Sequence, residues 1–165
     1  MKAISGILFC IIIIMTSCAN YKKVSDKQCK ILMDKSLLSI KVLLEKSNDD
    51  TSALLDFTID YSRKGFYLID KRSEREFDFS NKYFDVLIKY CDSNYVIVYC
   101  PVSGIMNGLT LSPLNHSDLF LINRRLGKKV LDIQTKAGGI TKALLINDTI
   151  YFEYYEPNIV RYVKI

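Results

Sequence analysis

The chain has 165 residues, and its 23 lysine and arginine side chains outnumber its 18 aspartate and glutamate side chains, which gives a formal net charge of +5. This length is typical of one globular domain that can bury a hydrophobic core. The basic excess is too mild to require a nucleic-acid partner. A single histidine without ligand spacing predicts no metal site, and in the absence of a nucleotide motif we expect no cofactor.

Residues 1–17 have the pattern of a secretory signal peptide. Lys2 supplies a positive charge, residues 4–15 form an apolar run, and Thr16 and Ser17 are small residues in front of Cys18. The apolar run is shorter than the ~20 residues that a helix needs to span a bilayer. We therefore expect residues 1–17 to be removed from the mature protein.

The end of this segment, from Met15 to Cys18, resembles the lipobox of bacterial lipoproteins. The resemblance covers residues 1–18 only, and it implies that Cys18 is lipidated and becomes the first residue of the mature chain. It also implies a location in the cell envelope, with the domain outside the cytoplasm and attached to a bacterial membrane through the lipid on Cys18. An ordinary secretory signal or an uncleaved anchor is the alternative.

Behind the anchor we expect a short tether over residues 18–25 and one globular α+β domain over residues 26–165. The six residues from Ala19 to Val24 reach ~20 Å when they are extended, so the domain should lie close to the membrane. A weak attraction to anionic lipid headgroups is the simplest use of the basic excess. The lysines that would lie near the membrane are Lys22, Lys23, Lys27 and Lys30.

Two helices are predicted in the first two thirds of the chain. Residues 26–47 carry apolar side chains at helical spacing, and Ser25 and Gln28 match a capping box. A second helix should follow Ser80, because apolar residues recur at helical spacing on one face as far as Cys91. Those residues are Phe84, Leu87, Ile88 and Cys91.

Between the two helices, the periodicity changes to that of strands. Residues 55–61 alternate apolar and polar side chains, and residues 66–70 return after a turn, which predicts a hairpin. The charged run 71–78 predicts an exposed connection. Further on, residues 95–100 are apolar on both sides, which is typical of a strand in the middle of a sheet.

The segment 102–117 is rich in glycine, serine, asparagine and proline, and we predict a loop there. Loops of this length are often functional. This one contains the only histidine of the chain, and we expect it to form the rim of any binding pocket. The candidate rim residues are Ser103, Asn107 and His116.

Cysteine and histidine chemistry is limited in this sequence. Apart from Cys18, the mature chain has Cys29, Cys91 and Cys100, so at most one internal disulfide bond can form. Such a bond would use Cys29, because a strand separates the other two; three buried thiols are the alternative. No G-x-S-x-G motif surrounds any serine that could act with His116. We therefore expect no catalytic residue and no enzyme.

The last third of the chain predicts an antiparallel meander, with strands near 118–123, 128–135, 140–147, 149–156 and 159–165. Four cations cluster around the first turn of this meander and form a candidate site for a phosphate or a carboxylate. A solvated hairpin tip is the alternative. The four cations are Arg124, Arg125, Lys128 and Lys129.

Turn lengths predict the register of the last three strands. If Asn147 and Asp148 form a two-residue turn, Lys142 faces Glu153, and a three-residue turn after that strand places Arg161 opposite Glu153. One face then mixes tyrosine, aliphatic and charged side chains, a composition typical of a protein–protein interface. Coverage of this face by a loop or by the first helix is the alternative. The candidate interaction face comprises Lys142, Leu144, Tyr151, Glu153, Tyr155, Arg161 and Val163.

The expected architecture is α+β, with two helices packed on one face of a curved, mostly antiparallel sheet that ends in a C-terminal β-meander. This element order is loosely similar to the cone-shaped folds of nuclear-transport-factor type, which often bind small ligands between helix and sheet. Two functions remain open. The first is a membrane-anchored, non-catalytic module that binds a protein partner, of the immunity, inhibitor or envelope-accessory type. The second is a lipoprotein that binds a small ligand in a pocket between the helices and the sheet.

Overall fold

The computed structural model of the protein describes residues 21–33, 36–49, 55–61, 65–79, 83, 85–101, 116–136, 139–154 and 159–165. Four residues of the predicted anchor and sites lie outside these ranges. They are Cys18, Ser103, Asn107 and Tyr155.

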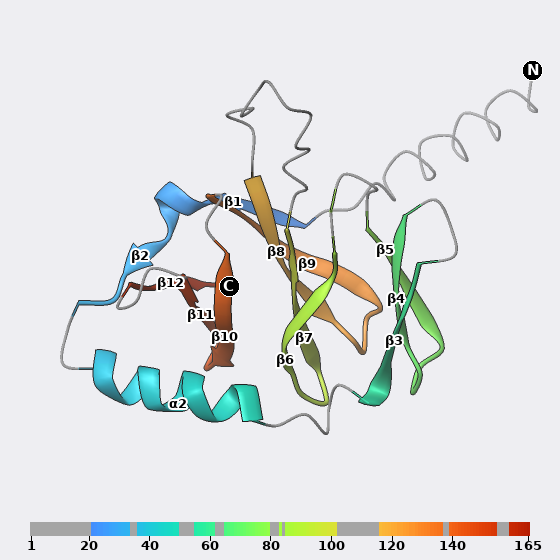
Figure 1. The fold of residues 1–165 in the computed structure, drawn as a ribbon, viewed down its shortest axis with the longest axis horizontal. Coiled ribbons are helices and arrows are strands. Elements are labelled where there is room, and N and C mark those ends of the chain that lie inside the picture. Colours follow the sequence, from blue (N-terminus) through green and yellow to red (C-terminus); the bar gives the residue numbers. More distant parts are fainter. Residues whose placement is uncertain are drawn as a thin grey trace, which may run out of the picture.

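The described residues form three sheets, one α-helix and one 3-10 turn (Figure 1). The central sheet has the order β1 (Lys22–Ser25), β9 (Lys128–Lys136), β8 (His116–Asn123), β7 (Tyr95–Cys100) and β6 (Leu87–Cys91). The four-stranded sheet has the order β10 (Ile140–Ile146), β11 (Thr149–Tyr154), β12 (Val160–Lys164) and β2 (Lys30–Ile31). The three-stranded sheet contains β3 (Phe57–Asp60), β4 (Phe66–Asp70) and β5 (Arg75–Phe79), and the two helical elements are the turn η1 (Asp26–Gln28) and α2 (Leu37–Asp49).

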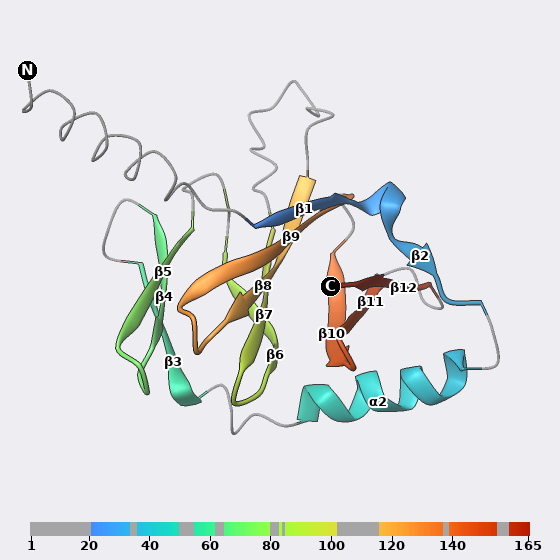
Figure 2. The same cartoon turned by 180° about the vertical axis from the view of Figure 1, so that it is seen from behind.

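These elements are stacked in four layers. The central sheet packs one face on the four-stranded sheet and the other face on the three-stranded sheet, and α2 covers the outer face of the four-stranded sheet. In both views, β1 and η1 lie along one edge of the molecule and α2 lies along the opposite edge (Figure 1, Figure 2). The start of the described chain is therefore separated from α2 by the body of the domain.

Strand β7 illustrates why the central sheet is apolar on both faces. Ile97 and Tyr99 belong to the core shared with the four-stranded sheet, whereas Val96, Val98 and Cys100 belong to the core shared with the three-stranded sheet. All five side chains are buried. The predicted strand over residues 95–100, and its place inside a sheet, are both confirmed.

The predicted helix over residues 26–47 is correct only in its second half. The backbone N–H of Ser25 donates to Oε1 of Gln28 (2.8 Å), as in a capping box, but this contact opens the short turn η1. The chain then forms β2, and the N–H of Leu32 donates to the carbonyl oxygen of Val160 (2.8 Å). Hydrogen bonds to β12 thus replace helical ones before α2 begins at Leu37.

The predicted second helix is wrong, because residues 87–91 form the edge strand β6 of the central sheet. A bulge between Ile88 and Tyr90 interrupts the pairing of β6 with β7. Ile88 and Cys91 therefore pack on the same side, against the core of the three-stranded sheet, whereas Tyr90 packs on the other side. A bulge inserts one extra residue into the alternation of a strand, so Ile88 and Cys91 face the same side although they are three positions apart. Three positions is also the spacing of residues on one face of a helix.

The hairpin of β3 and β4 is confirmed, but the prediction of an exposed connection over residues 71–78 is correct only in part. Residues 71–74 form an exposed turn, as predicted, whereas residues 75–79 form the strand β5 paired with β4. Phe77 and Phe79 point into the core. Glu76, just before Phe77, and Asp78, between the two phenylalanines, are exposed. The alternation of period two is present in the sequence, although the charges mask it.

The predicted α+β architecture is also wrong: among the described residues the fold is mostly β, with one helix and three sheets. The five C-terminal strands exist as predicted, but they do not form one meander. The first two belong to the central sheet and the last three to the four-stranded sheet. The change of sheet occurs between Lys136 and Ile140, where Gly139 has a positive φ of 68°.

The predicted register of the four-stranded sheet is correct on one side and wrong on the other. Lys142 lies opposite Glu153, and both turn residues, Asn147 and Asp148, have positive φ, as a two-residue hairpin turn requires. Arg161, however, lies opposite Phe152 and not opposite Glu153. This shift by one residue moves every side chain of β12 to the face opposite the predicted one.

Candidate functional site

The structure separates the residues of the predicted interaction face. Lys142, Leu144, Tyr151 and Glu153 share the outer face of the four-stranded sheet, whereas Arg161 and Val163 belong to its inner face because of the shifted register. Val163 packs against the core shared with the central sheet. Val160 and Tyr162 take their places on the outer face.

Helix α2 covers this outer face. Leu44 of the helix is 1% exposed and packs with Leu144 and Val160 of the sheet in a small apolar core. Lys142 forms an ion pair with Glu45 of the helix, and its Nζ also lies 3.8 Å from Glu153 Oε2. Of the two alternatives left open by the sequence, coverage by the first helix describes the arrangement. The same apolar core packs α2 against the sheet. The ligand pocket predicted between the helices and the sheet stays a prediction, because Ser103 and Asn107 of its rim lie outside the described residues.

Helix α2 presents apolar side chains on its outer side as well. Leu38 is 74% exposed, Val42 is 47% exposed and Leu43 is 41% exposed, and we call these three residues the α2 outer surface. Leu38 and Val42 are four residues apart, so they are neighbours on the helix. A helix that is apolar on both its inner and its outer sides is unusual at the surface of a single domain. The signal is present in the sequence Leu37–Leu44, in which six of the eight residues are apolar, but a search for one apolar stripe overlooks it.

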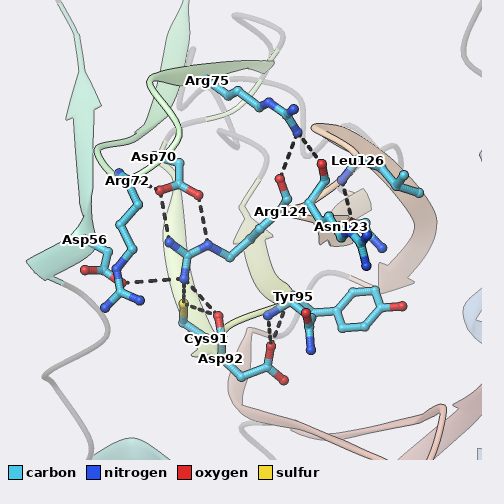
Figure 3. Close-up of polar contacts among 12 residues, drawn as sticks. Asp56, Asp70, Arg72, Arg75, Cys91, Asp92, Tyr95, Asn123, Arg124 and Leu126 are labelled. Atoms are coloured by element: carbon cyan, nitrogen blue, oxygen red, sulfur yellow. Dashed lines mark hydrogen bonds and ion pairs between the residues drawn. The ribbon is translucent and has the colours of Figure 1, made fainter.

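The four cations of the predicted anion site do not converge on one point. Arg124 is buried, Arg125 and Lys128 are exposed, and Nζ of Lys129 lies over the ring of Phe79, 4.2 Å from its centroid. Arg124 points into the molecule, between the central and three-stranded sheets (Figure 3). Its charge is therefore not directed at solvent.

The guanidinium of Arg124 is held by a bidentate contact with Asp70, at the end of β4. Nε donates to Oδ2 of Asp70 (2.8 Å), and Nη2 donates to Oδ1 (2.9 Å). Nη1 donates to the carbonyl oxygen of Asp92 (2.8 Å), in the turn between β6 and β7. The guanidinium also lies over the ring of Phe57, with 4.8 Å from Cζ to the centroid. One side chain thus joins the turn after β8 to two other parts of the fold (Figure 3).

The surroundings of Arg124 complete this cluster. Asp56 Oδ2 lies 3.5 Å from Nη1 of Arg124 and 2.8 Å from Nε of Arg72. Nη1 of Arg75 donates to the carbonyl oxygens of Arg124 (3.0 Å) and Arg125 (2.6 Å), which closes the turn from the other side. Burial opposes the ionisation of Asp70, but hydrogen bonds from Arg124 and from the N–H of Arg72 outweigh it and lower the pKa of Asp70. We interpret the Arg124 cluster as a structural clamp.

A second buried polar cluster lies near the end of the predicted pocket rim. The backbone of His116 pairs with that of Lys136 at the end of β8. Two residues further on, Asp118 is buried and accepts a hydrogen bond from the hydroxyl of Tyr83. Burial, and secondly this hydrogen bond, raise the pKa of Tyr83 far above its ordinary value. The hydroxyl therefore stays protonated and serves as a donor, which does not suit a nucleophile.

The thiols share this lack of reactivity. Cys29, Cys91 and Cys100 are thiols that are not joined in a disulfide bond, with Cys29 and Cys100 buried and Cys91 half-buried. Burial raises the pKa of Cys29 and that of Cys91 to about 11. Only the thiolate is a good nucleophile or metal ligand, so Cys29 and Cys91 are poor candidates for either role.

Comparison with known proteins adds no functional residue. No protein-family model, curated protein or solved structure matches the chain significantly. Among the described residues, no three His, Cys, Asp or Glu side chains form a group that could hold a metal ion. In the same part of the chain, no helix is both long and apolar enough to cross a bilayer. Of the exposed apolar side chains among the described residues, Leu38, Val42 and Leu43 lie within one helix.

Proposed function

We propose that the protein is a lipid-anchored, non-catalytic protein of the bacterial cell envelope that binds a partner protein through the α2 outer surface. The observation that carries this proposal is the exposure of Leu38, Val42 and Leu43 on the one described α-helix. Exposed apolar residues that gather on one element generally have a use. An amphipathic helix seated in an apolar groove is a common mode of protein recognition.

The orientation of the domain supports a protein partner over the bilayer itself. The lipid on Cys18 would be three residues from Tyr21, and three residues span at most ~10 Å. The anchored edge of the domain is therefore the edge of β1, and α2 lies along the opposite edge (Figure 1, Figure 2). The α2 outer surface would then point away from the membrane that holds the protein.

The chemistry of this surface defines the kind of partner. Lys46 is exposed one turn after Val42 on the helix. A complementary partner therefore offers an apolar groove with an acidic group at one end, as expected for an immunity, inhibitor or envelope-accessory protein. Such a role needs neither a nucleophile nor a cofactor.

The test compares two matched substitutions of exposed leucines. Full-length protein is crosslinked in native membranes and purified through a tag after Ile165, as wild type, Leu38→Asn or Leu126→Asn. Leu126 is 58% exposed in the turn between β8 and β9, away from α2. We expect Leu38→Asn to reduce recovery of a stoichiometric partner about tenfold, the effect of losing a residue central to an interface, and Leu126→Asn to leave it unchanged.

Equal recovery of the partner by both variants contradicts the assignment of the surface. Unfolding is excluded by thermal denaturation, because exposed substitutions change stability by about 0.5 kcal/mol or less. The anchor is tested separately with Cys18→Ser. If that variant stays in the membrane fraction, the lipoprotein assignment is refuted while the binding surface stands on its own result.

A further inference from the structure

The segment that follows the proposed anchor exposes charge of one sign only. Lys22, Lys23, Lys27 and Lys30 are all exposed along β1, η1 and β2. The acidic residue among described residues 21–33 is Asp26, and it is 6% exposed. Within this stretch, therefore, the charge that meets solvent is entirely positive.

The negative charge of Asp26 is used inside the fold. Its carboxylate accepts a hydrogen bond from the hydroxyl of Tyr154, and its Oδ1 lies 3.5 Å from Nε of Arg161. Nη1 of Arg161 also donates to the backbone carbonyl oxygen of Asp26 (3.1 Å). Because Arg161 compensates Asp26, the carboxylate does not offset the four lysines at the surface.

Regular structure holds these lysines in place. β1 pairs in parallel with β9, from Lys22 opposite Leu131 to Ser25 opposite Gln134, and β2 pairs with β12. Nζ of Lys22 donates to the backbone carbonyl oxygen of Lys164 at the end of β12 (3.3 Å). Lys164 is also exposed. The cations thus lie on an ordered border of the domain.

The aromatic residue at the start of this border fits the same environment. Tyr21 is half-buried, and Nζ of Lys23 lies 5.5 Å from the centroid of its ring. Tyrosine is favoured at the level of lipid headgroups, because it combines an apolar ring with a polar hydroxyl. Tyr21 is also the first described residue after Cys18, within ~10 Å of chain from it.

We propose that the part of this border formed by Lys22, Lys23 and Lys27, on β1 and η1, binds the phosphates of anionic phospholipid headgroups. The proposal rests on the lipid anchor at Cys18, which places the border at the membrane. The contact adds an electrostatic component to the attachment and sets the orientation of the domain, with β1 toward the lipid and α2 toward a partner. Attraction of this kind falls off within a Debye length, so it requires the closeness that the short chain between Cys18 and Tyr21 imposes.

Lysine footprinting on reconstituted, lipidated protein tests this proposal. The protein is attached to vesicles of phosphatidylcholine alone or to vesicles that contain about a third phosphatidylglycerol. An amine-reactive reagent is then added, and the extent of labelling of each lysine is measured. We expect the reactivity of Lys22 and Lys23 to fall about threefold or more in the anionic vesicles and to recover at about 1 M salt, where the Debye length is ~3 Å. Lys46, on α2 at the opposite edge, serves as the internal control and should not change.

A matched pair of variants tests whether the border acts as a unit. Lys27→Gln should weaken the protection of Lys22 and Lys23, because it removes a neighbouring positive charge, whereas Lys46→Gln should leave that protection intact. Equal weakening by both variants overturns the assignment, because it indicates a response to net charge alone.

Three further outcomes overturn the proposal and can be told apart. Equal reactivity of Lys22 in both kinds of vesicle, with the protein attached to each, overturns headgroup binding alone. Protection of Lys22 by inorganic phosphate in phosphatidylcholine vesicles indicates a site for the free anion. Failure of the protein to float with phosphatidylcholine vesicles overturns the anchor, and with it the orientation that this proposal derives from it.

Discussion

Replacing Arg124 with methionine keeps the apolar stem of the side chain but removes the guanidinium that holds Asp70. Asp70 is 1% exposed, and both of its carboxylate oxygens accept hydrogen bonds from Arg124 at 2.8 and 2.9 Å. In the variant, the N–H of Arg72, 3.0 Å from Oδ1, remains as a donor. The substitution therefore leaves a buried carboxylate that has lost its positively charged partner.

The cost of this change can be estimated from the burial of the pair. Removing one member of a buried ion pair costs about 3–5 kcal/mol, because the other charge stays buried without compensation. That is a large part of the roughly 5–15 kcal/mol that stabilises a typical domain. At about 2–4 °C per kcal/mol for a chain of this size, the melting temperature should fall by roughly 6–20 °C. Arg125→Met, at the exposed neighbouring position, should change stability by about 0.5 kcal/mol or less.

The sign of the pH dependence makes the prediction more specific. In the wild type, burial opposes ionisation of Asp70, but hydrogen bonds from Arg124 and from the N–H of Arg72 lower its pKa below the usual value. Its contribution to stability is therefore present above the ordinary aspartate pKa of about 4 and is lost as the pH falls further. Without Arg124, burial dominates and raises the pKa of Asp70, so acidification toward about pH 5 should partly restore the variant.

Urea denaturation at about pH 7 and about pH 5 measures both effects. The series contains wild type, Arg124→Met, Asp70→Asn and the double variant, so that a double-mutant cycle isolates the interaction of the pair. We expect the double variant to be more stable than Arg124→Met alone at the higher pH. A loss below about 1 kcal/mol in Arg124→Met would refute the clamp. A deficit relative to wild type that is equal at both pH values would refute the assignment to Asp70.

Two further predictions concern the turns and the thiols. Gly127→Ala should lower the free energy of unfolding in urea more than Gly139→Ala does. Both glycines have φ of 66 to 68°, a conformation that costs alanine about 1 kcal/mol. A Cβ at Gly127 would also lie 2.7 Å from the side chain of Arg75, whereas a Cβ at Gly139 would meet nothing within 4 Å. Equal costs would show that the arginine moves away freely. Because burial raises the pKa of Cys29 and Cys91 to about 11, both thiols should react with a thiol reagent at neutral pH much more slowly in the folded protein than in urea, and comparable rates would contradict this.

The candidate surfaces could be predicted from the sequence only in part. The hairpin turn at Asn147 and Asp148 is a local signal, and it correctly placed Lys142 opposite Glu153. No comparable turn signal defined the register of β12 relative to β11. The predicted register differs from the observed one by one residue, so Val160 and Tyr162, and not Arg161 and Val163, lie on the outer face. Because side chains alternate along a strand, a small error in register becomes a complete error in the composition of a face.

Arg124 illustrates the same limit for charged residues. Near Arg125, Lys128 and Lys129, it looked like one member of a basic turn, whereas the fold buries it against Asp70, which is 54 positions earlier in the chain. Local sequence contains no information about a partner at that distance. Conversely, the exposure of Leu38 could have been suspected, because the apolar residues of α2 lie on more than one side of the helix.

The sequence by itself determined the features that depend on neighbouring residues. They include the apolar pattern of β7, the alternation in β3 and the hairpin turn before β11, because periodicity and turn chemistry act over a few residues. Only the tertiary structure decided which sheet each strand joins, which face α2 covers and which charges are buried. Those outcomes depend on pairing between distant segments. The hydrogen bonds of β2 with β12 replace the first part of the helix that was predicted for residues 26–47. The bulge in β6 gives the apolar residues of a strand the spacing expected of a helix. Long-range pairing overrides local preference wherever it satisfies more backbone groups and buries more apolar surface.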